Sequence, residues 1–284
     1  MTAPDYLVIG HITADLTPEG RRLGGTASYA TRTASAFGLR VGVLTSAAQD
    51  EPLLDELRPY AEQMVVLPAD ATSTFENIYT ASGRTQYIRG VAARIRPEDV
   101  PSEWLSAPLV HLAPLTDEVD PQIGHRFKDS TVLLTLQGWL RRWEVDGRVR
   151  FKRWYDPVVL RDIDMVVFSE EDIPEAPELE GEFAQSVRHL FVTRAERGGT
   201  YYRQGEPIQY DTPQVEVVNP TGAGDVFAAA LLSSLYLTNH NMEASIRVAA
   251  RLGALSVTRW WLDGSPSREE VEQALAEVGY KPKS

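Results

Sequence analysis

The sequence predicts an α/β fold in which a mainly parallel β-sheet is covered by helices. Short runs rich in Val, Ile and Leu recur along the chain, and segments with helical spacing lie between several of them. Continuous apolar runs are typical of strands buried on both faces, and their alternation with helices is typical of parallel sheets. The 284 residues include 43% hydrophobic residues and no cysteine, as in a globular chain of one or two domains without disulfide or thiolate chemistry.

The expected elements begin close to the N-terminus and continue past residue 190. A helix is expected at 28–37, because its small residues have helical spacing and end at Gly38, the usual type of residue after a helix C-terminus. An antiparallel sandwich is the alternative, and it would need turn-linked alternating strands throughout the chain. The expected doubly buried strands are Tyr6–Ile9, Val41–Leu44, Met64–Leu67, Leu109–Leu112, Val132–Leu134, Met165–Phe168 and Leu190–Val192.

The segment from Thr74 to Gly90 breaks this pattern and indicates a half-exposed hairpin that turns at Ser82-Gly83. A single hairpin has too little core to be stable alone, so it must lie over another part of the protein. It is either a lid over a ligand cleft or a plain edge hairpin. We expect one domain over residues 1–284, with lid segments at about 11–22 and 72–96.

A second break, from Trp139 to Tyr155, mixes basic and aromatic residues around a turn at Asp146-Gly147. Such a segment could bind single-stranded nucleic acid by stacking, or it could be a cationic hairpin whose aromatic rings pack on the body. The 28 Lys and Arg against 40 Asp and Glu give a net charge of −12, which favours the packed hairpin. With no apolar run of membrane-spanning length and no basic start, we expect a cytoplasmic protein without nucleic-acid or membrane partners.

The most informative segment runs from Val217 to Phe227 and is followed by an Ala- and Leu-rich helical stretch, 228–237. Gly222 and Gly224 leave the backbone N–H groups at the start of this helix unobstructed. Unpaired N–H groups and the partial positive charge of a helix N-terminus together form an anion site. The sequence therefore predicts that this turn binds phosphate.

Asp225 comes directly after the glycine turn and has two interpretations. It caps the helix, or it faces the bound anion and removes a proton from an attacking hydroxyl. The second role fits phosphoryl transfer, which needs an oriented nucleophile beside a stabilised phosphate. Other nucleotide motifs are absent, because no Gly-Lys pair occurs and Phe227 replaces the third glycine of a dinucleotide fingerprint.

Residues 221–227, Thr-Gly-Ala-Gly-Asp-Val-Phe, resemble the C-terminal signature of the ribokinase-like, PfkB-type carbohydrate kinases. Residues 10–15 and the pair Gly24-Gly25 resemble that family's substrate-side motifs. The resemblance implies a three-layer sandwich with a small β lid. It also implies transfer of the terminal phosphoryl group of ATP, with Mg²⁺, to a hydroxyl of a small sugar or polyol.

The same resemblance implies a role for each matching residue. Asp225 would be the general base, and the amides of Gly222, Ala223 and Gly224 would form the anion hole. The acceptor would be held by Thr13, Asp15, Gly24 and Gly25, and the nucleotide by Thr193, Gly198 and Thr221. Asp172 would hold Mg²⁺ through water, although Ser169 replaces the Asn of the family's magnesium motif. Ala195 replaces a nucleotide-side glycine, and Asn219 replaces an aspartate linked to activation by monovalent cations.

Two short segments narrow the expected acceptor. Residues 23–29 and 136–141 resemble the corresponding segments of myo-inositol kinases, in which Gln137 and Arg141 would donate hydrogen bonds to polyol or phosphate oxygens. The alternative is that both residues only line the end of the sheet. A nucleoside kinase of the same fold and a non-catalytic sugar or nucleotide sensor remain alternative functions. The sequence leaves open whether two copies pair through the lid as a homodimer.

Overall fold

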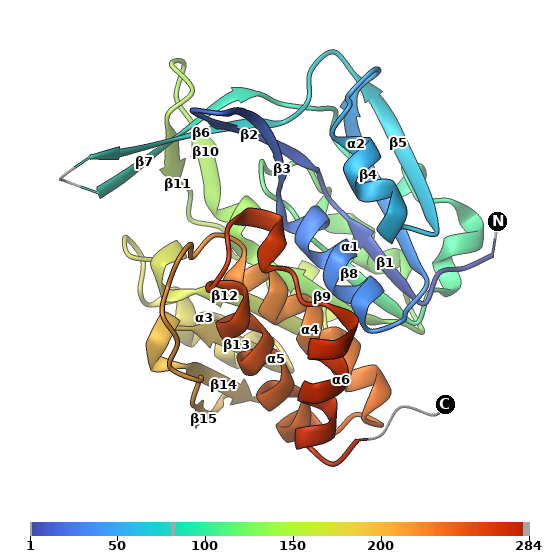
Figure 1. Cartoon of the computed structure of the whole chain (residues 1–284), viewed down its shortest axis with the longest axis vertical. Coiled ribbons are helices and arrows are strands. Elements are labelled where there is room, and N and C mark those ends of the chain that lie inside the picture. Colours follow the sequence, from blue (N-terminus) through green and yellow to red (C-terminus); the bar gives the residue numbers. More distant parts are fainter. Residues whose placement is uncertain (1, 81–82, 281–284) are drawn as a thin grey trace.

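A computed structural model describes residues 2–80 and 83–280 of the chain, and within them a nine-stranded central sheet is the main feature (Figure 1). Its strands are β1 (Tyr6–Ile9), β4 (Val41–Ala48), β5 (Gln63–Ala69), β8 (Leu109–Leu112), β9 (Thr131–Thr135), β12 (Met165–Ser169), β13 (His189–Thr193), β14 (Gly199–Arg203) and β15 (Glu206–Tyr210). They lie in the order β15-β14-β13-β12-β9-β8-β1-β4-β5. The strands from β13 to β5 are parallel, and β14 and β15 join one edge antiparallel. The predicted mainly parallel sheet is confirmed.

Each of the seven predicted strands is present, and the burial of β1 explains why such runs are apolar. Its residues Tyr6 and Val8 belong to one core cluster, whereas Leu7 and Ile9 belong to the cluster on the opposite face. The prediction was wrong for Met64–Leu67, which we expected to be buried on both faces. This run lies in β5 at the sheet edge, where only β4 pairs with it, and its residues are half-buried.

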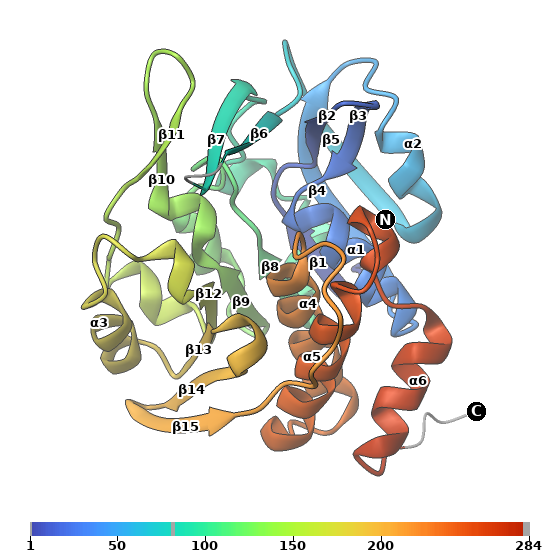
Figure 2. The same cartoon turned by 60° about the vertical axis from the view of Figure 1, so that its left-hand side comes forward.

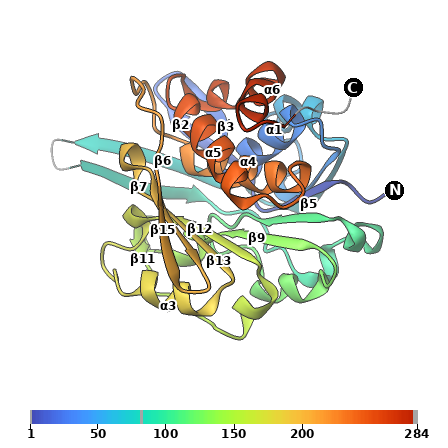
Figure 3. The same cartoon turned by 90° about the horizontal axis from the view of Figure 1, so that it is seen from below.

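Helices cover both faces of the sheet and complete the three layers (Figure 3). One core cluster contains buried residues of α1 (Thr26–Ala36), α2 (Leu54–Leu57), α4 (Ala223–Leu237), α5 (Met242–Ser256) and α6 (Arg268–Glu277), and the other contains those of α3 (Leu179–Ser186). The predicted helix at 28–37 begins two residues earlier and ends before Gly38, whose φ is 79°. None of these helices is long and apolar enough to cross a membrane within the described residues.

A separate four-stranded sheet, which we call the lid sheet, stands at the end of the body where β1 leaves the central sheet (Figure 1). It contains β2 (Thr13–Thr17), β3 (Gly20–Gly24), β6 (Thr74–Thr80) and β7 (Gly83–Gly90) in the order β3-β2-β6-β7. Phe75 and Ile88 of this sheet pack with Leu115 of the body. The predicted hairpin at 74–90 therefore belongs to a lid and not to the edge of the central sheet; Ser82 of its expected turn lies outside the described residues.

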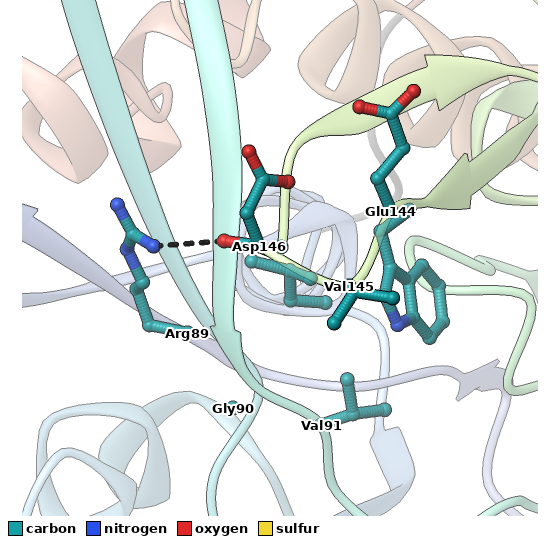
Figure 4. Close-up of a pocket in the computed structure, with 9 residues that line it drawn as sticks. Arg89, Gly90, Val91, Glu144, Val145 and Asp146 are labelled. Carbon is teal, nitrogen blue, oxygen red and sulfur yellow. Dashed lines mark hydrogen bonds between the residues drawn. The ribbon is translucent and has the colours of Figure 1, made fainter.

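A two-stranded hairpin, β10 (Arg141–Trp143) and β11 (Val149–Phe151), stands beside β7 (Figure 2). The predicted Asp146-Gly147 turn is present, with Gly147 at a φ of 87°. The amide of Ile88 donates to the carbonyl oxygen of Gly147 at 2.8 Å, which joins the hairpin to the lid sheet. Between β7 and the hairpin lies an open groove of about 370 Å³, where the Arg89 guanidinium donates to the Asp146 carbonyl oxygen (Figure 4).

Several aromatic and basic residues of this hairpin region have partners within the protein, whereas Trp143 is 37% exposed. Trp139 is fully buried, and Trp154 packs against it with ring centroids 4.5 Å apart. Among the basic side chains, Arg150 pairs with Glu144, Lys152 with Asp117 and Arg153 with Glu182. These contacts support the packed cationic hairpin.

Candidate active site

The order of the parallel strands identifies one end of the central sheet as the place for a ligand. The chain moves from β1 outward to β4 and β5, and then returns to the other side of β1 to form β8 and β9. Connections therefore leave the carboxyl ends of β1 and β8 in opposite directions. Ligands of open α/β sheets bind outside the carboxyl ends of the strands at such a switch point.

The glycine turn before α4 has the geometry expected of an anion site. Gly222 is the N-cap residue, has a φ of 88°, and is not capped by any side chain. A Cβ atom at Gly222 would lie 2.2 Å from the ring of Tyr29, so the backbone packs directly on this ring. A Cβ atom at Gly224 would meet nothing within 4 Å. The start of this 15-residue helix therefore offers open space to an anion beside the N-terminal end of its dipole.

Asp225 lies in the first turn of α4 and is held by a residue from the opposite end of the chain. The Thr26 hydroxyl, in the first turn of α1, donates to Asp225 Oδ1 at 2.7 Å. The capping interpretation of Asp225 is wrong, because Gly222 is the N-cap and no side chain caps this helix. The Asp225 carboxylate is instead directed across the site to the start of α1.

Asp225 is half-buried beside the open helix start, and burial of its carboxyl group is the largest influence on its pKa. Burial raises the pKa of Asp225 to about 6, and the hydrogen bond from Thr26 and the charge of Arg141 oppose this shift. The charges of Asp172 and Asp15 raise the same pKa further. Three residues predicted at the site therefore act on the Asp225 carboxyl from separate segments of the chain. A carboxylate with this pKa is ionised near neutral pH and remains basic enough to accept a proton.

The residues predicted to hold the acceptor come together where the lid sheet meets α1. Thr13 pairs directly with Gly24 in the lid sheet, and its hydroxyl donates to Asp15 Oδ1 at 3.1 Å. A Cβ atom at Gly24 would lie 2.3 Å from Asp15 Oδ2, so a larger residue here would displace the Asp15 carboxylate. Gly25 has a φ of 87° and is the N-cap of α1. Thr13, Asp15, Gly24 and Gly25 thus form one continuous polar wall.

Gln137 and Asp172 contact each other at the neighbouring edge of the site. Gln137 Nε2 donates to Asp172 Oδ1 at 2.9 Å, and the Ser169 amide donates to Asp172 Oδ2 at 2.9 Å. Both carboxylate oxygens keep lone pairs that suit a water-mediated cation. No group of three or more His, Asp or Glu side chains placed to hold a metal directly occurs within the described residues. Arg141 lies over the Phe75 ring, 5.7 Å from its centroid.

The residues predicted to bind the nucleotide lie at the carboxyl end of β13 and before α4. Thr193 pairs with Ser169, the residue that precedes the turn containing Asp172. Gly198 has a φ of 78°, and a Cβ atom there would lie 2.0 Å from the Tyr210 carbonyl oxygen. The amide of Thr221 donates to Asn219 Oδ1 at 2.9 Å, which fixes the approach to the glycine turn.

Two residues at the site were not predicted as functional. Thr26 was given no role of its own within residues 23–29, yet its hydroxyl orients Asp225. Tyr29 supports Gly222 with its ring, and burial raises the pKa of its phenol far above the usual value. The feature of the sequence that could have indicated a role for Thr26 is the position of its hydroxyl group directly after Gly24-Gly25.

Known proteins resemble this chain along most of its length. Residues 162–261 match the family described as pfkB family carbohydrate kinase. The chain is 26% identical over 275 residues to a cytidine kinase of Thermococcus kodakarensis, covering 90% of this chain and 97% of that protein. It is 34% identical over 112 residues to a ribokinase of Bacillus subtilis, covering 39% of this chain and 36% of that protein.

Solved structures show the same fold at lower identity. A pyrophosphate-dependent kinase of the ribokinase family, complexed with a pyrophosphate analogue and myo-inositol, superposes with a TM-score of 0.79 at 19% identity. That alignment covers 94% of this chain and 99% of the other. The ribokinase of Arabidopsis thaliana complexed with ribose and ATP gives 0.74 at 20% identity, covering 96% and 99%. The family match and these neighbours agree with the glycine turn and lid sheet: residues 162–261 match the pfkB family of carbohydrate kinases, and the chain has the fold of ribokinase-family kinases.

Proposed function

We propose that this protein transfers the terminal phosphoryl group of ATP to a hydroxyl of a small sugar or polyol. The observation that carries the proposal is the position of Asp225. Its carboxylate lies beside an open helix N-terminus, takes no part in capping, and is oriented by Thr26. An acid held next to an anion site is explained when it removes a proton from an incoming alcohol.

The acceptor class is inferred from the polar side chains predicted to line the acceptor side of the site. Asp15, Gln137 and Arg141 supply a carboxylate, an amide and a guanidinium, which suit a ligand with several hydroxyl groups. Relatives and structural neighbours include kinases named for ribose, fructose and cytidine, and one bound to myo-inositol. A nucleoside is the second candidate acceptor, because the cytidine kinase is similar over 97% of its own length.

In the proposed reaction, the acceptor hydroxyl gives its proton to the Asp225 carboxylate as its oxygen attacks the terminal phosphorus. The bond from that phosphorus to the bridging oxygen breaks, and ADP leaves. The amides of Gly222, Ala223 and Gly224 would stabilise the negative charge on the transferred group, and in this structure the Ala223 amide donates to the Pro220 carbonyl oxygen at 3.4 Å. Thr193, Gly198 and Thr221 hold the nucleotide, and the lid sheet excludes water that would otherwise hydrolyse ATP.

Mg²⁺ supplies positive charge that neutralises the donor phosphates. Asp172 is the residue that would hold it through water, because hydrogen bonds from Gln137 and Ser169 fix the orientation of its carboxylate. Through its hydrogen bond to Asp172, Gln137 links the acceptor side of the site to the donor side.

An acceptor panel tests the proposal. Purified protein is incubated with Mg²⁺ and D-ribose, D-fructose, myo-inositol or cytidine, with either ATP or pyrophosphate as donor. We expect ATP to support phosphorylation of one sugar or polyol at a rate at least about tenfold above the no-acceptor control. Product from cytidine alone would favour the nucleoside candidate. Saturable binding of an acceptor without any phosphorylated product would instead support a sensor.

The pKa of Asp225 predicts how turnover depends on pH. Only the ionised carboxylate accepts a proton, so kcat/KM for the acceptor is expected to fall as pH decreases through about 6. The contribution of Asp225 to the stability of the folded protein changes with pH in the opposite direction. The pKa of Asp225 in the folded protein lies above its usual value of 3.8, so the contribution of this group to stability is fully present below pH 3.8 and is lost as pH rises through about 6. A pH profile of kcat/KM that stays flat from pH 5 to 8 would contradict the role of Asp225.

A further inference from the structure

Glu118 is a buried carboxylate that the proposed chemistry does not use. It lies in the loop after β8 and is only 3% exposed. Its Oε2 accepts from the amides of Leu115 at 2.9 Å and Thr116 at 2.6 Å, and its Oε1 accepts from the amide of His11 at 3.0 Å. A single side chain therefore joins the loop after β8 to the connection between β1 and the lid sheet.

The loop held by Glu118 touches two segments of the acceptor site. A Cβ atom at Gly25 would lie 2.9 Å from Leu115 Cδ1, so Leu115 packs directly on the start of α1. The amide of Gly138 donates to the Pro114 carbonyl oxygen at 3.1 Å, and a Cβ atom at Gly138 would lie 2.2 Å from the Pro114 carbonyl carbon. The loop therefore sets the positions of Gly25 and of the residue next to Gln137.

His11 extends this hydrogen-bond network to the lid sheet. Its Nε2 lies 2.8 Å from the Ala93 carbonyl oxygen, just after β7, and must carry the hydrogen because a carbonyl only accepts. Its Nδ1 lies 2.7 Å from Ser73 Oγ, just before β6. The Ser73 carbonyl oxygen in turn accepts from the Ala14 amide at 2.8 Å, between Thr13 and Asp15.

The charge of Glu118 is compatible with this arrangement. Burial by itself raises the pKa of Glu118, but the charge of His11 and the backbone donors outweigh it and hold the pKa below the usual value. The group is therefore an ionised acceptor at neutral pH. Its two oxygens face N–H and O–H donors, including the Thr116 hydroxyl at 3.1 Å.

We propose that Glu118 is a positioning residue for the acceptor site, where it fixes the lid connection and the start of α1 relative to each other. The inference rests on the proposed phosphoryl transfer to a hydroxyl acceptor. Glu118 acts through Leu115 on Gly25 and through His11 on the strand that carries Thr13 and Asp15. Its connection to the nucleotide side is less direct, because it runs from the Pro114 contact with Gly138 through Gln137 to Asp172.

The test is Glu118→Gln, which keeps the size of the side chain but has a single acceptor oxygen. Its NH₂ group would face N–H donors at one end of the network. We expect the KM for the acceptor to rise about tenfold or more, with the KM for ATP within about twofold of wild type. Equal increases in both KM values, or no change in either, would overturn the proposal.

Two further variants separate positioning from general stability. Tyr6→Phe breaks a buried hydrogen bond of 2.7 Å to His111 in the body, so it should lower Tm without changing the acceptor KM. Thr116→Val removes only one donor to Glu118 and should raise the acceptor KM in the same direction but less. If Glu118→Gln does not fold, Thr116→Val decides: an acceptor KM equal to that of wild type would overturn the proposal.

Amide hydrogen exchange tests positioning independently of the proposed function. In Glu118→Gln or Thr116→Val, amides of residues 11–15 and 24–26 should exchange faster than in wild type, whereas Tyr6→Phe should leave them unchanged. Absence of phosphoryl transfer in wild type would refute the proposed function, while unchanged exchange at these amides would refute the positioning role.

Discussion

Replacing Asp225 with Asn is expected to lower kcat by about 10² to 10⁴, the usual contribution of a general base. The Asn side chain has the same size and keeps an oxygen that accepts from the Thr26 hydroxyl, so the site geometry should persist. Its amide has no basic oxygen that could take the acceptor proton. Steady-state kinetics with saturating acceptor should therefore show a loss in kcat, with the KM for ATP nearly unchanged.

Stability provides the control for Asp225→Asn. Because burial raises the pKa of Asp225 to about 6, the ionised carboxylate is unfavourable in the folded protein at pH 8. Removing that charge should leave Tm equal to or above that of wild type, so lower turnover cannot be attributed to unfolding. Turnover equal to wild type in the Asn variant would show that Asp225 is not the general base.

A matched variant, Thr26→Val, addresses the orientation of the same carboxylate. Val retains the shape of Thr but donates no hydrogen bond, and this bond lowers the pKa of Asp225. The acid limb of the pH profile should therefore move to higher pH, with a smaller loss in kcat at pH 8 than in Asp225→Asn. An unshifted limb would show that Thr26 does not tune the base.

The fold and half of the site were predictable because their signals are local. Apolar runs such as the one at β1 are continuous since both of their faces are buried, and this property is visible in four consecutive residues. The glycine turn at Gly222 and Gly224 is likewise contained in one short segment. The burial of β5 was mispredicted because the position of a strand within a sheet depends on partners far away in the sequence.

The other half of the site depends on long-range packing that no local pattern encodes. Thr26 contacts Asp225 across 199 positions, and Glu118 contacts the His11 amide across 107. A threonine at a helix start and a glutamate in a loop are ordinary residues until the sheet topology brings their segments together. Residues that reach the candidate site only through contacts between distant parts of the chain are therefore the ones that a single sequence does not reveal.

Substitutions in the glycine turn are expected to have the second large effect on activity. Its two glycines are required for different reasons. Gly222→Ala places a side chain at a φ of 88°, which costs about 1–2 kcal/mol, and its Cβ would lie 2.2 Å from the Tyr29 ring. The turn must then move away from Tyr29, so we expect both Tm and kcat/KM to fall, the latter by about 10² or more. In a Tyr29→Leu background the same change should lower Tm less, because only the backbone strain remains.

Gly224→Ala should instead separate stability from activity. Its Cβ would meet nothing within 4 Å, and Ala is favoured over Gly in a helix by about 1 kcal/mol, so Tm should be unchanged or higher. The added methyl occupies the space through which phosphate oxygens would approach the amides of α4, so we expect kcat/KM for ATP to fall by about tenfold or more. Thermal unfolding and donor kinetics on this one variant distinguish the two roles. Wild-type kinetics would mean that no phosphate reaches this turn, whereas a stable protein with impaired use of ATP would show that Gly224 is required for the approach of the donor and not for folding.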